Sequence, residues 1–99
     1  MNMQSLMAQA QKMQRDLEKK KNELEKMEFK GNSEWVEVTF NGDKKLKDVK
    51  ILKDGIIEEE DKEILSDMIQ IAVKDALNKV DEETSKKLGN YASAMNGLF

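Results

Sequence analysis

The sequence predicts an α+β fold in which two long helices flank a three-stranded antiparallel sheet, in the order α-β-β-β-α. Residues 1–27 carry apolar side chains at alternating intervals of three and four, which is the period of an amphipathic helix. Residues 28–53 combine period-two alternation with turn dipeptides, which indicates short strands joined by hairpins. Residues 58–88 return to helical periodicity. The 99 residues suffice for a single domain.

An apolar seam runs along the first predicted helix. Its members occupy the a and d positions of a heptad, which is typical of a helix that packs against another helix. They are Met3, Leu6, Ala10, Met13, Leu17, Leu24 and Met27. Lys20 takes the one d position that is not apolar, and no Pro or Gly occurs before Gly31. At 1.5 Å per residue this helix is about 40 Å long, whereas a compact domain of this size has a radius of gyration of about 13 Å. We therefore expect the helix to need a partner chain.

Three strands are predicted between the helices. The first is the short segment 28–30, which is followed by turn-forming residues at 31–33. Residues 35–40 show the clearest strand pattern, because β-branched and aromatic side chains alternate there with period two. One face of this strand carries Val36, Val38 and Phe40.

A hairpin is predicted next at Asn41-Gly42, since both residues accept positive φ. The return strand spans 46–52 and is expected to turn Val49 and Ile51 inward. Lys47 shares the parity of these two residues in a regular strand.

The second predicted helix follows the acidic segment 58–61. Acids in a first turn complement the helix dipole, and this interpretation is favoured over a calcium or magnesium site because the ligand spacing of a metal loop is missing. From 61 to 87 the apolar positions are too many for one stripe, so we expect the helix to pack on its own sheet and on a second surface. The tail 89–99 is expected to be flexible.

Composition excludes most kinds of catalytic site. The chain has no Cys and no His, so it offers no disulfide, no thiolate metal site and no histidine base. No nucleophile–base pair, Gly-rich phosphate loop or metal-ligand cluster occurs. We therefore expect neither an enzyme nor a cofactor or small-molecule substrate. No signal-peptide pattern and no apolar run of membrane-spanning length is present, which favours a cytoplasmic protein without membrane contact.

Charge is distributed unevenly along the chain. The net charge is −3, but residues 1–53 hold twelve Lys or Arg against nine acids, and residues 54–99 hold five against eleven. An anionic partner should therefore meet the first half.

A basic stripe lies opposite the seam on the first helix. With Met3 at position a, the heptad places Lys12, Lys19 and Lys26 at c and Arg15 at f. Cations sorted in this way can contact a phosphate backbone; the alternative is a solvated face with i,i+4 ion pairs. Two further lysines lie nearer the seam. The candidate DNA-binding residues are thus Lys12, Arg15, Lys19, Lys20, Lys21 and Lys26.

A second basic cluster surrounds the last hairpin and strand. It consists of Lys44, Lys45, Lys47, Lys50 and Lys53. Lysines on edge strands commonly prevent sheet-to-sheet aggregation, and we favour that role over nucleic-acid binding.

Dimerisation is expected because the core of so short a chain is thin. Trp35 points away from the Val36 face and is either an interface residue or an exposed stacking residue; interface burial is favoured for so large an aromatic side chain. The candidate interface residues are Met3, Leu6, Ala10, Met13, Leu17, Leu24, Trp35, Ile69 and Val73.

The order of several segments resembles the YbaB/EbfC family of small bacterial nucleoid-associated proteins. The segments are Leu6–Gln14, Val36–Gly42, Val49–Ile51 and Ala72–Ala76, and the resemblance covers about residues 4–89. It implies an intertwined homodimer of α-β-β-β-α protomers that binds double-stranded DNA with helices projecting like tweezer arms. It also implies a role in nucleoid organisation and gene regulation rather than catalysis.

Two residues depart from the family pattern. Gly55 follows Asp54 where members often have Asp-Pro, so we expect a looser start of the second helix. Arg15 is the only arginine, which favours phosphate contacts, weak selectivity and salt-sensitive binding over bidentate base reading. The rival hypothesis is a protein–protein adaptor that does not bind DNA.

Overall fold

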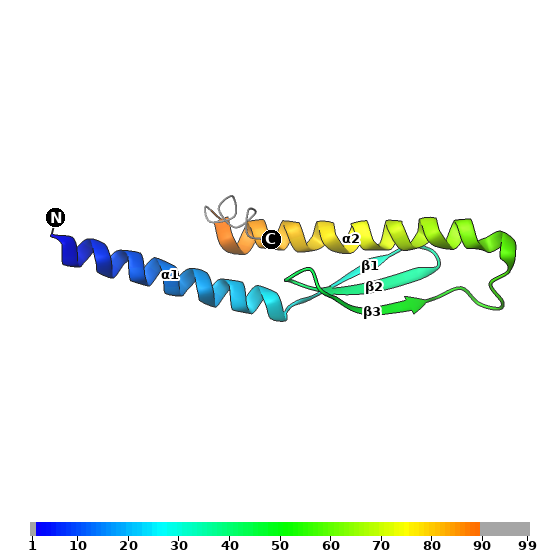
Figure 1. Cartoon of the computed structure of the whole chain (residues 1–99), viewed down its shortest axis with the longest axis horizontal. Helices are drawn as coiled ribbons and strands as arrows, with labels where there is room; N and C mark the ends of the chain where they lie inside the picture. The colour runs from blue at the N-terminus through cyan, green and yellow to red at the C-terminus, as the bar shows by residue number, and fades with distance from the viewer. Residues whose placement is uncertain (1, 90–99) are drawn as a thin grey trace.

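The computed structural model, which describes residues 2–89, confirms the predicted order of elements (Figure 1). The elements are α1 (Met3–Lys26), β1 (Glu28–Asn32), β2 (Val36–Asn41), β3 (Leu46–Ile51), a short 3-10 helix η1 (Glu59–Asp61) and α2 (Lys62–Leu88). The predicted tail 89–99 lies, apart from Gly89, outside the described residues. The molecule measures 70 × 19 × 17 Å, with a radius of gyration of 19.1 Å. It is elongated because α1 projects beyond the rest of the chain.

Helix α1 is an arm that is held only at its C-terminal end. It begins at Asn2, whose side-chain oxygen accepts a hydrogen bond of 2.8 Å from the Ser5 N–H. It ends where Met27 becomes extended. Leu24 is buried in the core, with 1% of its surface exposed, and Leu17 packs beside the core, whereas Met3 is 76% exposed. The N-terminal half of the seam is therefore uncovered within the chain.

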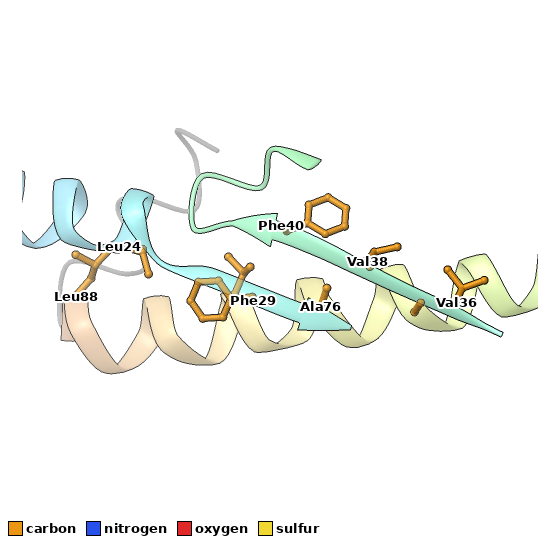
Figure 2. Close-up of a cluster of buried hydrophobic side chains, with 9 residues drawn as sticks. Leu24, Phe29, Val36, Val38, Phe40, Ala76 and Leu88 are labelled. Atoms are coloured by element: carbon orange, nitrogen blue, oxygen red, sulfur yellow. The ribbon is translucent and has the colours of Figure 1, made fainter. Parts of the chain in front are cut away.

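The sheet is antiparallel, and its strands lie in the order β1-β2-β3. Phe29 of β1 is opposite Phe40 of β2, and Val38 of β2 is opposite Val49 of β3. Helix α2 covers one face and packs against β1 and β2. Figure 2 shows the resulting core, in which side chains from the sheet, from α2 and from the end of α1 meet. Its labelled members are Leu24, Phe29, Val36, Val38, Phe40, Ala76 and Leu88.

Small residues allow α2 to approach β1 closely. Gly31 lies against the backbone of α2, and a Cβ at this position would overlap the Ala72 carbonyl oxygen and lie 2.7 Å from the Ala76 Cβ. Both alanines are fully buried. Only glycine fits at this contact, because any side chain would push the helix off the strand.

The outer edge of β1 is closed by side chains of α2. The Asn32 N–H donates to Asp75 Oδ2 at 3.0 Å, and Lys79 Nζ donates to the Lys30 carbonyl at 2.7 Å. Lys79 and Asp75 also form an ion pair at 3.4 Å. These contacts satisfy backbone groups that an edge strand otherwise offers to other chains. The hydrogen bond from Asn32 and, secondarily, the charge of Lys79 lower the pKa of Asp75 below its ordinary value.

Strand β3 differs from the expectation in two respects. Val49 and Ile51 do share the face of Val38, but they are 45% and 46% exposed, because α2 lies over β1 and β2. The expected face of Lys47 is wrong. A register shift between Thr39 and Phe40 places Leu46 opposite Phe40, so that Lys47 turns to the other face and forms an ion pair with Glu28.

The connection from β3 to α2 contains Gly55 with a φ of 82°. Proline could not adopt this conformation, because its ring fixes φ near −65°. The acidic segment that follows forms η1, and the Glu58 N–H donates to Asp61 Oδ2 at 3.0 Å. Helix α2 ends at Gly89, whose φ is 50°.

Candidate nucleic-acid interface

The basic stripe (Lys12, Arg15, Lys19 and Lys26) is fully formed on α1. All four side chains are exposed. At 3.6 residues per turn they fall within an arc of about 60° and along about 20 Å of the helix. Leu17 and Leu24, which pack on the core, lie about 180° away around the same helix. The stripe therefore faces away from the sheet and from α2.

The cations of the stripe have no carboxylate partner within residues 2–89. Across residues 2–89, none of the four forms an ion pair. The face is solvent-exposed, as the alternative expects, but within residues 2–89 it lacks the i,i+4 ion pairs of that alternative. Glu23, an acid beside the stripe, is instead paired with Lys87 of α2 at 3.6 Å. The stripe is consequently a continuous row of positive charge.

The two remaining α1 candidates occupy different environments. Lys20 is exposed to one side of the stripe, whereas Lys21 is partly buried. Lys21 lies about 180° from Lys12 around the helix and interacts within the chain. The structure therefore separates Lys21 from the other five candidates.

The second basic cluster is largely neutralised by carboxylates. Lys44 pairs with Asp81 at 3.1 Å and Lys45 with Asp43 at 3.6 Å, while the remaining pairs are Lys47–Glu28 and Lys53–Asp61. Within the described part of the chain, only Lys50 of this cluster lacks an ion pair. Exposed pairs add little stability, but they cancel the local positive potential. The hydrogen bond and the charge of Lys47 lower the pKa of the Glu28 carboxyl.

A comparison with known proteins identifies the family of this chain. The sequence model of the YbaB/EbfC DNA-binding family matches residues 1–95. The chain belongs to this family. Its members are nucleoid-associated DNA-binding proteins rather than enzymes.

Two relatives and one solved structure illustrate the similarity. The nucleoid-associated proteins SpyM50270 of Streptococcus pyogenes serotype M5 and SPs0261 of serotype M3 are each 44% identical over 97 residues, which covers 96% of this chain and 97% of theirs. The crystal structure of the uncharacterized protein HP0035 from Helicobacter pylori superposes with a TM-score of 0.73 at 27% identity, and the match covers 100% of this chain and 99% of that one.

The expected interface residues of this YbaB/EbfC chain divide into two groups. Leu24 is buried in the core of its own chain. Three others are partly buried beside that core, namely Leu17, Trp35 and Val73. The second group is exposed and consists of Met3, Leu6, Ala10, Met13 and Ile69. Only the second group offers a largely free apolar surface.

Sequence reasoning missed one apolar surface, which we call the β3 face. It consists of Leu46, Val49 and Ile51, which share a face of the sheet and are each about half exposed. On α2, Val73 lies about 160° from Asp75. Because Asp75 bonds the outer edge of β1, Val73 lies on the side of α2 toward β3. The bulge at Lys47 hid Leu46 from a period-two pattern, although the apolar residues at 49 and 51 were a usable signal.

Other kinds of site are missing from residues 2–89. No group of three or more acidic side chains there is arranged to hold a metal ion. No helix in this range is long and apolar enough to cross a membrane.

Proposed function

We propose that this YbaB/EbfC protein binds double-stranded DNA mainly through phosphate contacts of the basic stripe. The observation that carries the proposal is that four exposed cations share one face of α1 and have no ion-pair partner within residues 2–89. Such cations release counterions when they meet DNA phosphates, which supplies sequence-independent affinity. Three of the four are lysines, which act as point charges. Lys20 borders the stripe and adds charge, whereas Lys21 is proposed to contribute only to the general field.

We further propose that the protein acts as a homodimer. The support is apolar surface that residues 2–89 of a single chain leave open, namely the β3 face, Ile69 of α2 and the exposed seam of α1. A second copy related by a two-fold axis would cover the same surface on both protomers. The outer edge of β1 is already occupied by α2, which leaves the β3 side as the available one.

The proposed cellular role rests on the relatives of the chain. Its relatives in Streptococcus pyogenes are named nucleoid-associated proteins. We therefore propose that a dimer with two basic arms locates to the nucleoid, alters DNA conformation, organises the nucleoid and regulates gene expression.

A charge-reversal experiment tests the DNA interface. Lys12→Glu/Arg15→Glu/Lys19→Glu should lower affinity for duplex DNA by at least about tenfold. It should also flatten the plot of log K against log salt by about 0.9 for each lost phosphate contact. Lys45→Glu/Lys50→Glu/Lys62→Glu makes the same change in net charge away from α1 and should retain most of the affinity. Equal effects of the two variants would remove the stripe from the mechanism.

The wild-type protein decides between the two classes of function. If it binds no duplex at micromolar concentration in low salt, the DNA hypothesis fails and the adaptor hypothesis takes its place. If light scattering shows a monomer at the same concentration, the proposal of a homodimer fails.

A further inference from the structure

Beside the basic stripe, α1 carries a second row of side chains that suits base recognition. This row, called the amide line, consists of Gln4, Gln11 and Asn22. The three residues fall within an arc of about 20°, at intervals of about two and three helical turns. All are exposed, and within the described part of the chain none makes a hydrogen bond through its side chain. Polar groups so placed are available to a ligand.

Arg15 lies between the two rows. Going around the helix, the three lysines of the stripe come first, Arg15 follows, and the amide line comes last, over about 100° in total. Gln11 and Arg15 are one turn apart, about 6 Å along the axis. Lys12 and Lys19 flank them on the stripe. The side-chain chemistry therefore changes across this face from point charges to groups with directed donors and acceptors.

The two rows match two features of a DNA groove, namely the phosphates along its rim and the base edges on its floor. Lysine contacts phosphates without regard to sequence. Glutamine pairs with the N6 and N7 edge of adenine, and arginine with the O6 and N7 edge of guanine. An α-helix about 10–12 Å wide fits a major groove about 12 Å wide. The arm can enter it because its N-terminal half projects beyond the sheet (Figure 1), and the residues of both rows are exposed.

We infer that α1 lies in the major groove with Lys12 and Lys19 on one phosphate backbone and with Gln11 and Arg15 on base edges. This assigns Arg15, the one stripe cation with a bidentate side chain, to base reading, which departs from the sequence-based expectation of phosphate contact for this residue. This inference rests on the proposed DNA binding and adds to it a specificity-determining pair. Acids border this face on both sides, because Glu18 lies about 20° beyond Gln11 and Asp16 lies about 40° beyond Lys12. Phosphate contact is therefore confined to the lysines that lie between them.

Selection from a pool of randomised duplexes, followed by sequencing of the bound fraction, tests the inference on the full chain. The wild type should enrich a short motif and bind it more tightly than a shuffled duplex. Gln11→Ala/Arg15→Lys keeps the charge, and should lose most of this preference, about 5- to 150-fold per bidentate contact, with little change in salt dependence. Gln9→Ala removes an exposed amide about 160° from Gln11 and should leave the motif unchanged.

Each outcome decides a different point. A wild type that binds DNA but enriches no motif overturns base reading and leaves the proposed function intact. The same motif and preference in Gln11→Ala/Arg15→Lys would also overturn it. A wild type that binds no DNA refutes the proposed function itself. Circular dichroism and light scattering of each variant show whether its fold and assembly match the wild type.

Discussion

The ammonium group of Lys53 lies 5.2 Å from the centroid of the Trp35 ring. The same Nζ donates to the Ile56 carbonyl at 3.1 Å and forms an ion pair with Asp61 at 3.5 Å. One side chain thereby joins the start of β2, the connection after β3 and η1. This lysine therefore stabilises the connection that contains Gly55.

Lys53→Met should lower the free energy of unfolding by about 1–2 kcal/mol, because it removes a cation–π contact and a partly buried ion pair together. The emission of Trp35, the only tryptophan, should shift as its surroundings become more mobile. Urea unfolding followed by tryptophan fluorescence measures both effects. Lys50→Met, at an exposed lysine without an ion pair in the described residues, should change stability by less than about 0.5 kcal/mol.

Gly31→Ala should be the more damaging of two glycine substitutions. Its methyl group would collide with backbone atoms of α2 at Ala72 and Ala76, and forced overpacking costs about 1–3 kcal/mol or more. At Gly55 a Cβ would meet no atom within 4 Å. Gly55→Ala should therefore lower the free energy of unfolding only through its left-handed backbone, by about 1–2 kcal/mol. Denaturant midpoints for the two variants give the comparison; a larger loss at Gly55 would contradict the close helix–strand contact.

Asp75→Asn should destabilise the fold at neutral pH and change its response to acid. The pKa of Asp75 is lower in the folded chain than its ordinary value of 3.8. Its carboxylate therefore contributes stability above that ordinary value, and this contribution is lost as pH falls through the lower folded value. Thermal melts across acid pH should show a shallower pH dependence for Asp75→Asn than for the wild type. Asp67→Asn, at an exposed position of the same helix, should melt like the wild type near pH 7.

Val49→Glu/Ile51→Glu should weaken the proposed dimer. Both side chains are about half exposed on the β3 face, and a charge there would be buried against the second copy. Light scattering should show a shift toward monomer at micromolar concentration. Lys50→Glu, on the opposite face of the same strand, should leave the oligomeric state unchanged. A stable dimer in the double variant would place the interface elsewhere.

Much of the fold could be predicted because local patterns agreed with each other. Helical spacing continues without interruption up to Met27, and Asn41-Gly42 fits a hairpin between two alternating segments. The face of Lys47 was not predictable in the same way. A bulge shifts parity by one residue, and no local residue preference marks this one. The closeness of Gly31 to α2 also depends on tertiary packing, which spacing along the chain does not record.

The candidate site also contains features that the sequence could predict and features that it could not. Sorting charges by heptad position identified the basic stripe, since helix geometry alone fixes which residues share a face. It treated Lys20 and Lys21 alike, whereas only Lys21 is partly buried. Nor could spacing reveal that Asp81, far along the chain, neutralises Lys44. Ion pairs between distant segments decide which lysines remain available to DNA, and these depend on the folded structure.

The arm has a thermodynamic consequence. Its N-terminal half gains no free energy from packing within the chain, so its helix depends on the Asn2 cap and on residues with high helix propensity. Isolated helices shorter than about 12–15 residues are marginal in water. In a single chain, the outer turns of α1 are therefore expected to fray first on warming, and a second copy or a DNA ligand that contacts them contributes order as well as contact. Part of the free energy of association offsets the cost of ordering this helix. We therefore expect the affinity to fall with temperature more steeply than it would for an arm that is already fully helical.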